Sequence, residues 1–281
     1  MRQQRTIRRA GTLRGVAIHS GNTTELKILP APPDHGIVFR RTDLPGSAPL
    51  QLNPALSLEA KRGTNIRQAE VQIMTVEHLL SALNGLGIDN IILELDGPEL
   101  PIGDGSALPF VELIENAGSV EQAPAKRDIR LKTPLTVERG NGRITAIPHH
   151  CLSIDFLLNF PQTPVGRQAA AYSEDTDDYR ASLAPARTFG FRHEIAALWQ
   201  AGLARGGSLD NAIVVEKDGY STPLRFENEL ARHKIVDLIG DLMLLGQPIK
   251  AHFICIQSGH QLDIELVKKI WEDLSSARPP Q

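Results

Sequence analysis

The chain has 281 residues, of which 41% are hydrophobic and 22% charged, and its net charge is −3. This length and apolar content suffice for one large domain or two of average size. The charge balance excludes the strongly basic surface typical of general nucleic-acid binders. No window of eighteen residues is apolar and uncharged, so we expect no integral membrane association. Cys151 and Cys255 lie in apolar runs, which favours buried thiols in a cytoplasmic enzyme over a disulfide framework.

The first part of the chain has the pattern of short strands followed by helices. Apolar residues at helical spacing predict a helix from Thr75 to Leu86, with the Thr75 hydroxyl as its N-cap. The other elements expected in this part are strands at Gly15–His19, Glu25–Leu29, Gly36–Arg40 and Ile91–Leu95, and a helix at Leu108–Ala117.

A polar segment, Glu121–Arg127, contains a proline and shows no periodicity, so we expect the domain boundary there, between domains 1–122 and 128–281. The polar tail Ser275–Gln281 is expected to be frayed. The second part also has strands before helices, which predicts two α+β domains, each a sheet covered by helices on one face. Its expected elements are strands at Leu135–Glu138, Arg143–Ile147, Ser153–Leu158 and Ala251–Ile256, and helices at Glu194–Ala201, Glu227–Leu245 and Ile264–Leu274.

Two helical patterns could together form a metal site. His233 and Asp237 lie four residues apart and so share one helix face, with Asp241 one turn further as a possible supporting carboxylate. Glu77 and His78 stand at the start of the other helix, and zinc proteases use such a pair as base and ligand. Each pattern alone is more often an ordinary surface or interhelical pair. Together His78, His233 and Asp237 supply the three ligands of a catalytic zinc site, with Glu77 as the base for water.

Two further segments have chemically useful residues. His260 follows a predicted strand beside Gly259 and could act as an acid or as a positive charge, although an isolated histidine there is more often a solvated loop residue. Thr188 could donate to a developing oxyanion, and Phe189 and Phe191 could form a pocket wall, although such a run is more often core. The glycine-containing segment 191–215 is unusually apolar, so it either packs inside the protein or lines a slot for a lipid chain.

Read together, these motifs resemble the UDP-3-O-acyl-N-acetylglucosamine deacetylases, zinc enzymes of lipid A synthesis in Gram-negative bacteria. The matching motifs occur in one order along nearly the whole chain. They include Gly15–Gly21, Thr75–Leu83, Asp96–Ser106, Ala186–Phe191, Gly206–Asn211, Arg232–Asp237 and Ser258–His260.

The resemblance implies an α+β fold of two similar domains, each a mixed sheet with two helices packed on one face and one zinc between the domains. It implies that His78, His233 and Asp237 bind zinc, Glu77 is the base and His260 the charged partner, with Thr188, Lys234 and Asp241 close by. Phe156 and Phe189 would meet the nucleotide sugar, and an apolar βαβ insert around 191–215 would form the acyl passage. Its implied substrate contacts are Phe191, Ile195, Leu203, Ala204, Ser208, Ala212 and Val214.

The expected reaction is hydrolysis of the N-acetyl group of a UDP-linked acylated glucosamine by a monomer. Two departures from the family pattern bear on this expectation. Gln257 stands where a lysine is expected to bind the diphosphate, for which Lys234 or Arg143 could compensate, and Asp263 replaces an asparagine and adds negative charge near His260. The alternatives are a deacetylase of a related N-acyl sugar nucleotide, which Gln257 favours, and a non-catalytic binding module of this fold.

Overall fold

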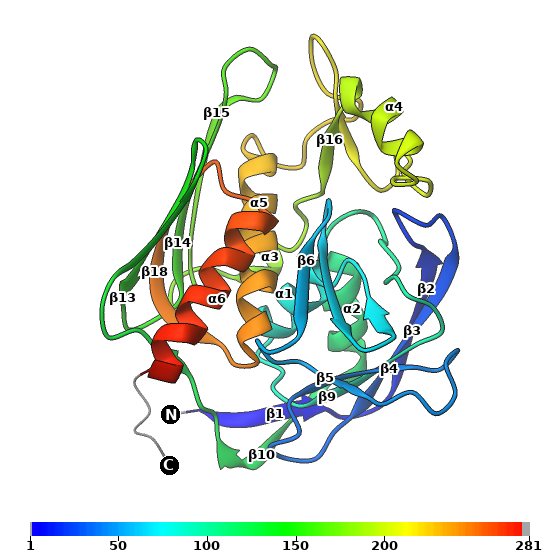
Figure 1. The fold of residues 1–281 in the computed structure, drawn as a ribbon, viewed down its shortest axis with the longest axis vertical. Helices are drawn as coiled ribbons and strands as arrows, with labels where there is room; N and C mark the ends of the chain where they lie inside the picture. The colour runs from blue at the N-terminus through cyan, green and yellow to red at the C-terminus, as the bar shows by residue number, and fades with distance from the viewer. Residues whose placement is uncertain (1, 277–281) are drawn as a thin grey trace.

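In the computed structural model, which describes residues 2–276, two sheets lie on the outside and their helices face each other between them (Figure 1). The first half is built on a five-stranded sheet in the order β2-β3-β9-β4-β5, and β9 pairs parallel with β4 but antiparallel with β3. The elements of this sheet and its helices are β2 (Gly11–Val16), β3 (Thr23–Pro30), β4 (Ile37–Arg41), β5 (Leu50–Gln51), β9 (Ile91–Leu95), α1 (Glu77–Gly85) and α2 (Leu108–Ala117).

The second half is built on a six-stranded sheet in the order β12-β13-β18-β14-β15, with β11 also pairing with β18. This sheet is mixed too, because β14 runs parallel to β18. The two long helices α5 and α6 cover the face that looks toward the first half (Figure 1). The elements are β11 (Ile129–Arg130), β12 (Leu135–Arg139), β13 (Gly142–Pro148), β14 (Ser153–Phe160), β15 (Gly166–Ser173), β18 (Ile249–Ile256), α5 (Glu229–Leu242), the 3-10 turn η1 (Met243–Leu245) and α6 (His260–Ser276).

Three small units complete the fold. One is the antiparallel pair β1–β10, another the sheet β6-β7-β8, and the third a βαβ unit in which β16 and β17 pair in parallel on either side of α4. Their bounds, with the short helix α3, are β1 (Gln3–Ile7), β6 (Ser57–Ala60), β7 (Thr64–Gln68), β8 (Val71–Ile73), β10 (Ser119–Ala125), α3 (Tyr179–Ser182), β16 (Phe189–Phe191), α4 (Arg192–Gln200) and β17 (Ile213–Val215). Within residues 2–276 no helix is long and apolar enough to cross a membrane.

The two halves meet where α1 packs against α5. A Cβ on Gly240 would lie 2.0 Å from the Glu77 carbonyl oxygen, so only glycine allows the two backbones to approach this closely. Around this contact the apolar faces of both helices are fully buried in a core shared by the two sheets. The close approach brings Glu77 and His78 on α1 next to the metal-ligand motif on α5.

The expected fold class is confirmed, but several local expectations were wrong. Thr75 is not the N-cap of α1: its φ is +60° and its hydroxyl lies 3.3 Å from Glu99, while the helix starts two residues later without a side-chain cap. The segment Glu121–Arg127 is largely strand β10, whose polarity reflects its exposed position rather than a lack of structure. His260 is the first residue of α6 rather than a loop residue. Of the tail expected to fray, Ser275 and Ser276 belong to α6, and residues 277–281 lie outside the described part.

Candidate active site

Three donor groups from the two facing helices converge at the centre of the molecule. His78 Nε2 lies 3.5 Å and His233 Nε2 3.3 Å from the same Asp237 oxygen, Oδ1. The two imidazoles meet edge to face, with centroids 5.0 Å apart. All three side chains are buried. The i, i+4 spacing on α5 therefore brings His233 and Asp237 together as predicted, and α1 supplies the third donor.

The orientation of His233 is fixed by the loop before β16. Its Nδ1 donates to the Ala186 carbonyl oxygen at 3.0 Å, which leaves Nε2 with the free lone pair that a metal needs. The loop is tied to α5 by Arg187, whose guanidinium donates to the buried Glu229 carboxylate at 2.8 Å. Burial lowers the pKa of His233 to about 4, so the imidazole is neutral at physiological pH.

The donor set fits a divalent cation such as zinc. Asp237 Oδ1 is buried without a hydrogen-bond donor among the described residues, and the Nε2 atoms of His78 and His233 face it. A buried carboxylate oxygen without a donor favours a cation beside it. Asp237 Oδ2 already accepts a hydrogen bond from Lys234 Nζ at 2.6 Å, so Oδ1 is the oxygen left for a metal. Two histidines and one carboxylate form a common catalytic zinc set.

Glu77 lies beside these donors in a position suited to a base. Its Oε2 accepts a hydrogen bond from the Thr64 backbone amide at 2.9 Å, which fixes the carboxylate at the start of α1. The other oxygen, Oε1, lies 3.9 Å from His260 Nε2. Burial raises the pKa of Glu77, which makes it a better proton acceptor than an exposed glutamate.

His260 is held as a cation by a buried carboxylate. Its Nδ1 lies 2.8 Å from Asp241 Oδ2, and Thr64 donates its hydroxyl to the other oxygen of Asp241 at 2.5 Å. Although burial opposes it, the Asp241 charge raises the pKa of His260 to about 10. Asp241 therefore stabilises the His260 imidazolium and does not orient a metal ligand. The Nε2 atom of His260 points toward Glu77 and Asp237.

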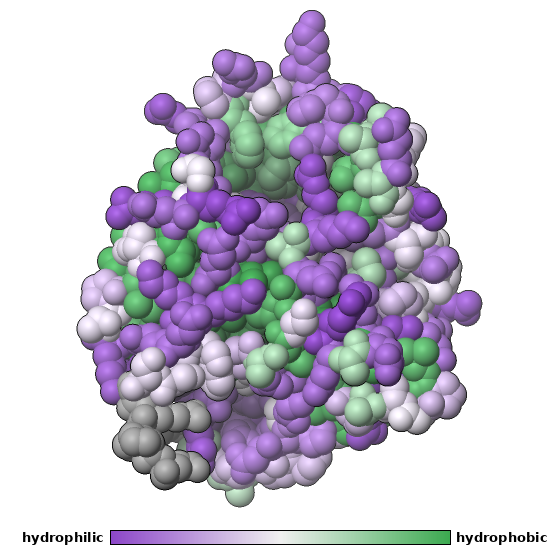
Figure 2. Space-filling model, in the orientation of Figure 1, coloured by the Kyte–Doolittle hydropathy of each residue, from purple (hydrophilic) through white to green (hydrophobic). Residues whose placement is uncertain are grey.

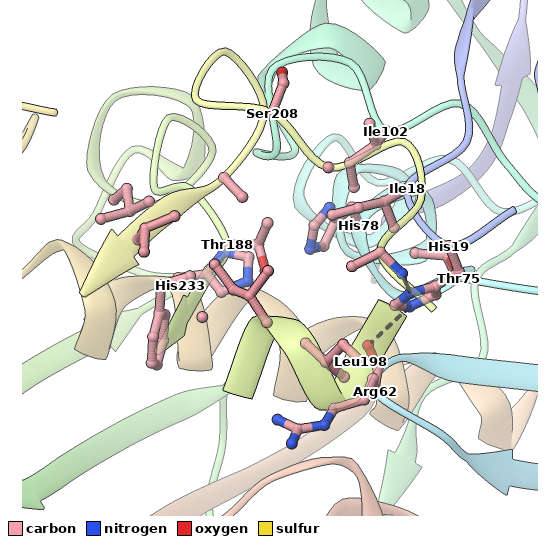
Figure 3. A pocket seen from close by; sticks show the side chains of 18 of the residues that line it. Ile18, His19, Arg62, Thr75, His78, Ile102, Thr188, Leu198, Ser208 and His233 are labelled. Atoms are coloured by element: carbon pink, nitrogen blue, oxygen red, sulfur yellow. Dashed lines mark hydrogen bonds between the residues drawn. The ribbon is translucent and has the colours of Figure 1, made fainter. Parts of the chain in front are cut away.

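An apolar cavity of about 390 Å³ opens from these polar groups. Figure 3 shows His78, Thr188 and His233 at one end of a common space that Ile18, Ile102 and Leu198 also border. The βαβ unit contributes much of the wall. Of the residues predicted to contact substrate, those that line the cavity are Phe189, Ile195, Ala204, Ser208, Ala212 and Val214.

Other predicted contact residues lie elsewhere. Phe156 is buried in the core on the helix-covered face of β14, because side chains alternate along the strand and this position points inward. Phe191 packs on Phe160, with ring centroids 5.2 Å apart, and does not line the cavity. Leu203 borders a neighbouring cleft. Lys234 does not line the cavity either, because its ammonium group is held by Asp237.

Comparison with known proteins agrees with this geometry. The model of the family UDP-3-O-acyl N-acetylglycosamine deacetylase (LpxC) matches residues 4–272. The chain belongs to this family. Proteins named UDP-3-O-acyl-N-acetylglucosamine deacetylase are similar over nearly the full length of both chains. The protein of Chromobacterium violaceum is 42% identical over 96% of this chain and 90% of its own length, and that of Saccharophagus degradans is 44% identical over 97% and 93%.

A larger cleft of about 1000 Å³ adjoins His260 in this member of the LpxC family. Gln257 lies there and donates its amide to the Asn159 carbonyl oxygen at 2.6 Å. Neither of the two cations expected to compensate borders the cleft: Lys234 is bound by Asp237, and Arg143 pairs with Glu138. The lysine and arginine side chains that border the cleft are Lys61, Arg62 and Arg139, of which Arg62 pairs with Glu194 and Arg139 with Glu265. Figure 2 shows the molecular face hollowed between the β14–β15 hairpin and α4, with apolar residues around the hollow.

Sequence reasoning missed three residues of the site. Thr64 joins Glu77, Asp241 and His260 through its amide and hydroxyl. Thr75 and His19 line the cavity, and the buried carboxylate of Glu99 holds both through the His19 amide at 2.7 Å and the Thr75 hydroxyl at 3.3 Å. The available signal was a polar residue directly after Gly63 in a strand, which is too common a pattern to single out Thr64.

Proposed function

We propose that the protein is a zinc-dependent hydrolase that removes the N-acetyl group of UDP-3-O-(3-hydroxyacyl)-N-acetylglucosamine and releases acetate, a step of lipid A biosynthesis. The observation that carries the proposal is the unpartnered Asp237 Oδ1 facing two imidazoles, with a base and an imidazolium on the same side. The names of the relatives support the choice of substrate. A non-catalytic binding module would have no need for three metal ligands together with a base and an imidazolium.

The residues have distinct roles in the proposed reaction. His78, His233 and Asp237 would hold one zinc ion, which supplies Lewis acidity that acidifies water and polarises a carbonyl. Glu77, fixed by the Thr64 amide, accepts the proton of the attacking water. His260, kept protonated by Asp241, stabilises the tetrahedral anion and passes a proton to the departing amine. The Thr188 side chain lines the cavity, and its hydroxyl would donate to the same oxyanion.

The two spaces beside these residues match the two ends of the substrate. The apolar cavity under α4 suits the 3-hydroxyacyl chain, because Ile18, Ile102, Ile195, Leu198 and Val214 form an apolar part of its wall. The larger cleft suits the UDP end, with Lys61, Arg62 and Arg139 as the cations nearest to a diphosphate. Gln257 does not add a positive charge there, so these three residues take the role expected of the missing lysine.

Metal analysis and acetate release test the proposal together. We expect one zinc bound by His78, His233 and Asp237, with turnover lost in Glu77→Ala and His260→Ala while that zinc is retained. Unchanged turnover in Glu77→Ala would refute the mechanism. Hydrolysis of another N-acyl sugar nucleotide in preference to the acylated substrate would favour the alternative substrate.

The acyl passage has its own test. Ala212→Phe places a ring in the cavity, so kcat/KM should fall at least tenfold for the acylated substrate but little for UDP-N-acetylglucosamine, which lacks the chain. Ala196→Phe is the matched control, because Ala196 lies on α4 but is exposed outside the cavity. Equal effects of Ala212→Phe on both substrates would contradict the assignment.

We further propose that the enzyme works as a monomer in the cytoplasm. The catalytic groups all come from one chain, so no second copy is needed to complete the site. Both cysteines are free and buried, which is consistent with a reducing compartment. Sedimentation of the active protein at working concentration tests the monomer, and a dimer required for activity would contradict it.

A further inference from the structure

A second cluster of metal-ligand side chains lies at the opposite end of the second sheet. His149, His150 and Cys151 follow β13 in the turn that leads into β14, and Glu174 and Asp175 follow β15. Because β14 and β15 pair antiparallel along their whole length, the turn before β14 and the turn after β15 are neighbours at the same end of the sheet. The catalytic groups lie beyond the other end of β14, whose eight residues span roughly 25 Å.

The ligand atoms of this cluster are close enough to share one ion. Donor atoms of His149, His150 and Cys151 all lie within 4.8 Å of one another, and the same holds for Cys151, Glu174 and Asp175. Cys151 Sγ is 3.4 Å from His149 Nδ1, and His150 Nε2 is 3.0 Å from Asp175 Oδ2. Both triplets therefore contain the Cys151 thiol, and the contact between His150 and Asp175 also links them.

Charge and burial single out four of these residues. Glu174 Oε1 already accepts from the Leu152 amide and from Lys250, whereas Asp175 has only its contacts with His150 and with the neighbouring thiol. Cys151 is buried, while the His150 side chain is 72% exposed and can turn. A buried thiol with exposed histidine and aspartate partners, whose side chains can change rotamer, allows a tetrahedral arrangement to form without moving the strands.

We propose that His149, His150, Cys151 and Asp175 form a second metal site that binds a divalent transition-metal ion, with zinc the best match. Two imidazoles, one thiolate and one carboxylate are ligands that zinc accepts in tetrahedral geometry, while magnesium and calcium prefer oxygen donors. The ion would replace the Cys151 thiol proton and link the β13–β14 turn to the turn after β15. Its distance from Glu77 and His260 makes it a structural site, separate from the proposed hydrolysis.

Cobalt(II) distinguishes the two sites by their ligands. The catalytic donors are nitrogen and oxygen, so a thiolate-to-cobalt charge-transfer band can come only from one of the two cysteines, Cys151 or Cys255. We expect the full-length protein to bind two equivalents of cobalt or zinc, with this band developing alongside one of them. Cys151→Ser should abolish the band and one equivalent, whereas Cys255→Ser, at a buried position within β18, should change neither.

Substitutions at exposed ligands make the test independent of folding. His150→Ala and Asp175→Asn alter largely solvent-exposed side chains and should weaken the second equivalent by about tenfold or more. Acetate release should remain that of the unmodified protein, because these residues lie outside the active site. The absence of a charge-transfer band in the unmodified protein, or a band that persists in Cys151→Ser, would overturn the proposal whatever the outcome for the catalytic site.

Discussion

Replacing Asp241 by asparagine tests most directly the proposal that Asp241 keeps His260 protonated. The Asp241 carboxylate is the main reason why the pKa of His260 rises from its usual 6.5 to about 10. That difference corresponds to about 5 kcal/mol in favour of the imidazolium. In Asp241→Asn the burial of the ring and the nearby Lys234 charge are opposed mainly by the weaker effect of Asp237, so the pKa should fall to about 6.5.

The expected loss of activity follows from the protonated fraction. At pH 8 a pKa near 10 leaves about 99% of the ring protonated, whereas a pKa of 6.5 leaves about 3%, so kcat/KM should drop by about thirtyfold or more. The basic limb of the pH profile should move from the alkaline range to below neutrality. A bound divalent cation lowers both pKa values but largely preserves the difference between the two proteins.

Two controls separate charge from structure. Thr64→Val removes the hydroxyl that binds Asp241 Oδ1 but keeps the carboxylate, so the basic limb should stay alkaline. Asp155→Asn removes a comparable carboxylate from His252, 2.8 Å away on the outer face of the sheet, and should leave the pH profile unchanged. The measurement is kcat/KM for acetate release between pH 5 and 10 on zinc-loaded protein. A basic limb that stays in place in Asp241→Asn would refute the role given to the imidazolium.

Three other substitutions probe packing and buried charge. Gly240→Ala puts a Cβ 2.0 Å from a backbone carbonyl of α1, so it should lower the free energy of unfolding by about 1–3 kcal/mol and reduce activity. Gly219→Ala is the control, because its Cβ meets no atom within 4 Å and should change neither quantity. Denaturant unfolding and turnover assays measure both effects. Arg187→Leu leaves the buried Glu229 carboxylate without its ion pair and should lower the free energy of unfolding in urea by about 3–5 kcal/mol. It should also weaken zinc binding in a chelator competition, because Arg187 holds the loop whose Ala186 carbonyl orients His233. Unchanged zinc affinity would contradict this role of the loop. Burial raises the pKa of Asp263 from 3.8 to about 7. The unfolded chain therefore ionises at lower pH than the folded one, so the carboxylate destabilises the fold progressively from about pH 4 to 7 and fully above. Asp263→Asn should thus stabilise the protein at pH 8, by about 4 kcal/mol at most, but hardly at pH 4, and equal gains at both pH values would refute this account.

The long helices and the pairing of His233 with Asp237 on α5 were predictable because their signals are local. The apolar stripe of α1, the strand β9 and the helix α2 follow from periodicity and glycine stops, and His233 and Asp237 share a face through i, i+4 spacing alone. The prediction that His78 lies beside His233 and Asp237 rested on the need of a catalytic zinc for three protein ligands and on the resemblance to the deacetylase family. Close packing at Gly240 is the physical reason that this pairing occurs.

What the sequence did not predict depends on contacts between distant segments. Thr64 acquires its role only when β7 meets α1, α5 and the start of α6, and no local pattern records that meeting. The inward position of Phe156 was likewise hidden, because a strand with one buried face can be assigned to either face until its neighbours are known. The strands β5, β6 and β8 have only two to four residues, too few for a periodic signal.

The division of the proposed catalytic groups between two helices should tie activity to the packing of the two halves. Glu77 and His78 belong to α1, whereas His233, Asp237 and the supporting Asp241 belong to α5, and the helices touch backbone to backbone at Gly240. A metal bound by both helices stabilises their docked arrangement by the free energy of binding, since the separated helices offer only part of the ligand set. Removing the metal should therefore loosen the α1–α5 contact first. Amide exchange of α1 and α5 should accelerate in metal-free protein while that of β18, deep in its own sheet, changes less.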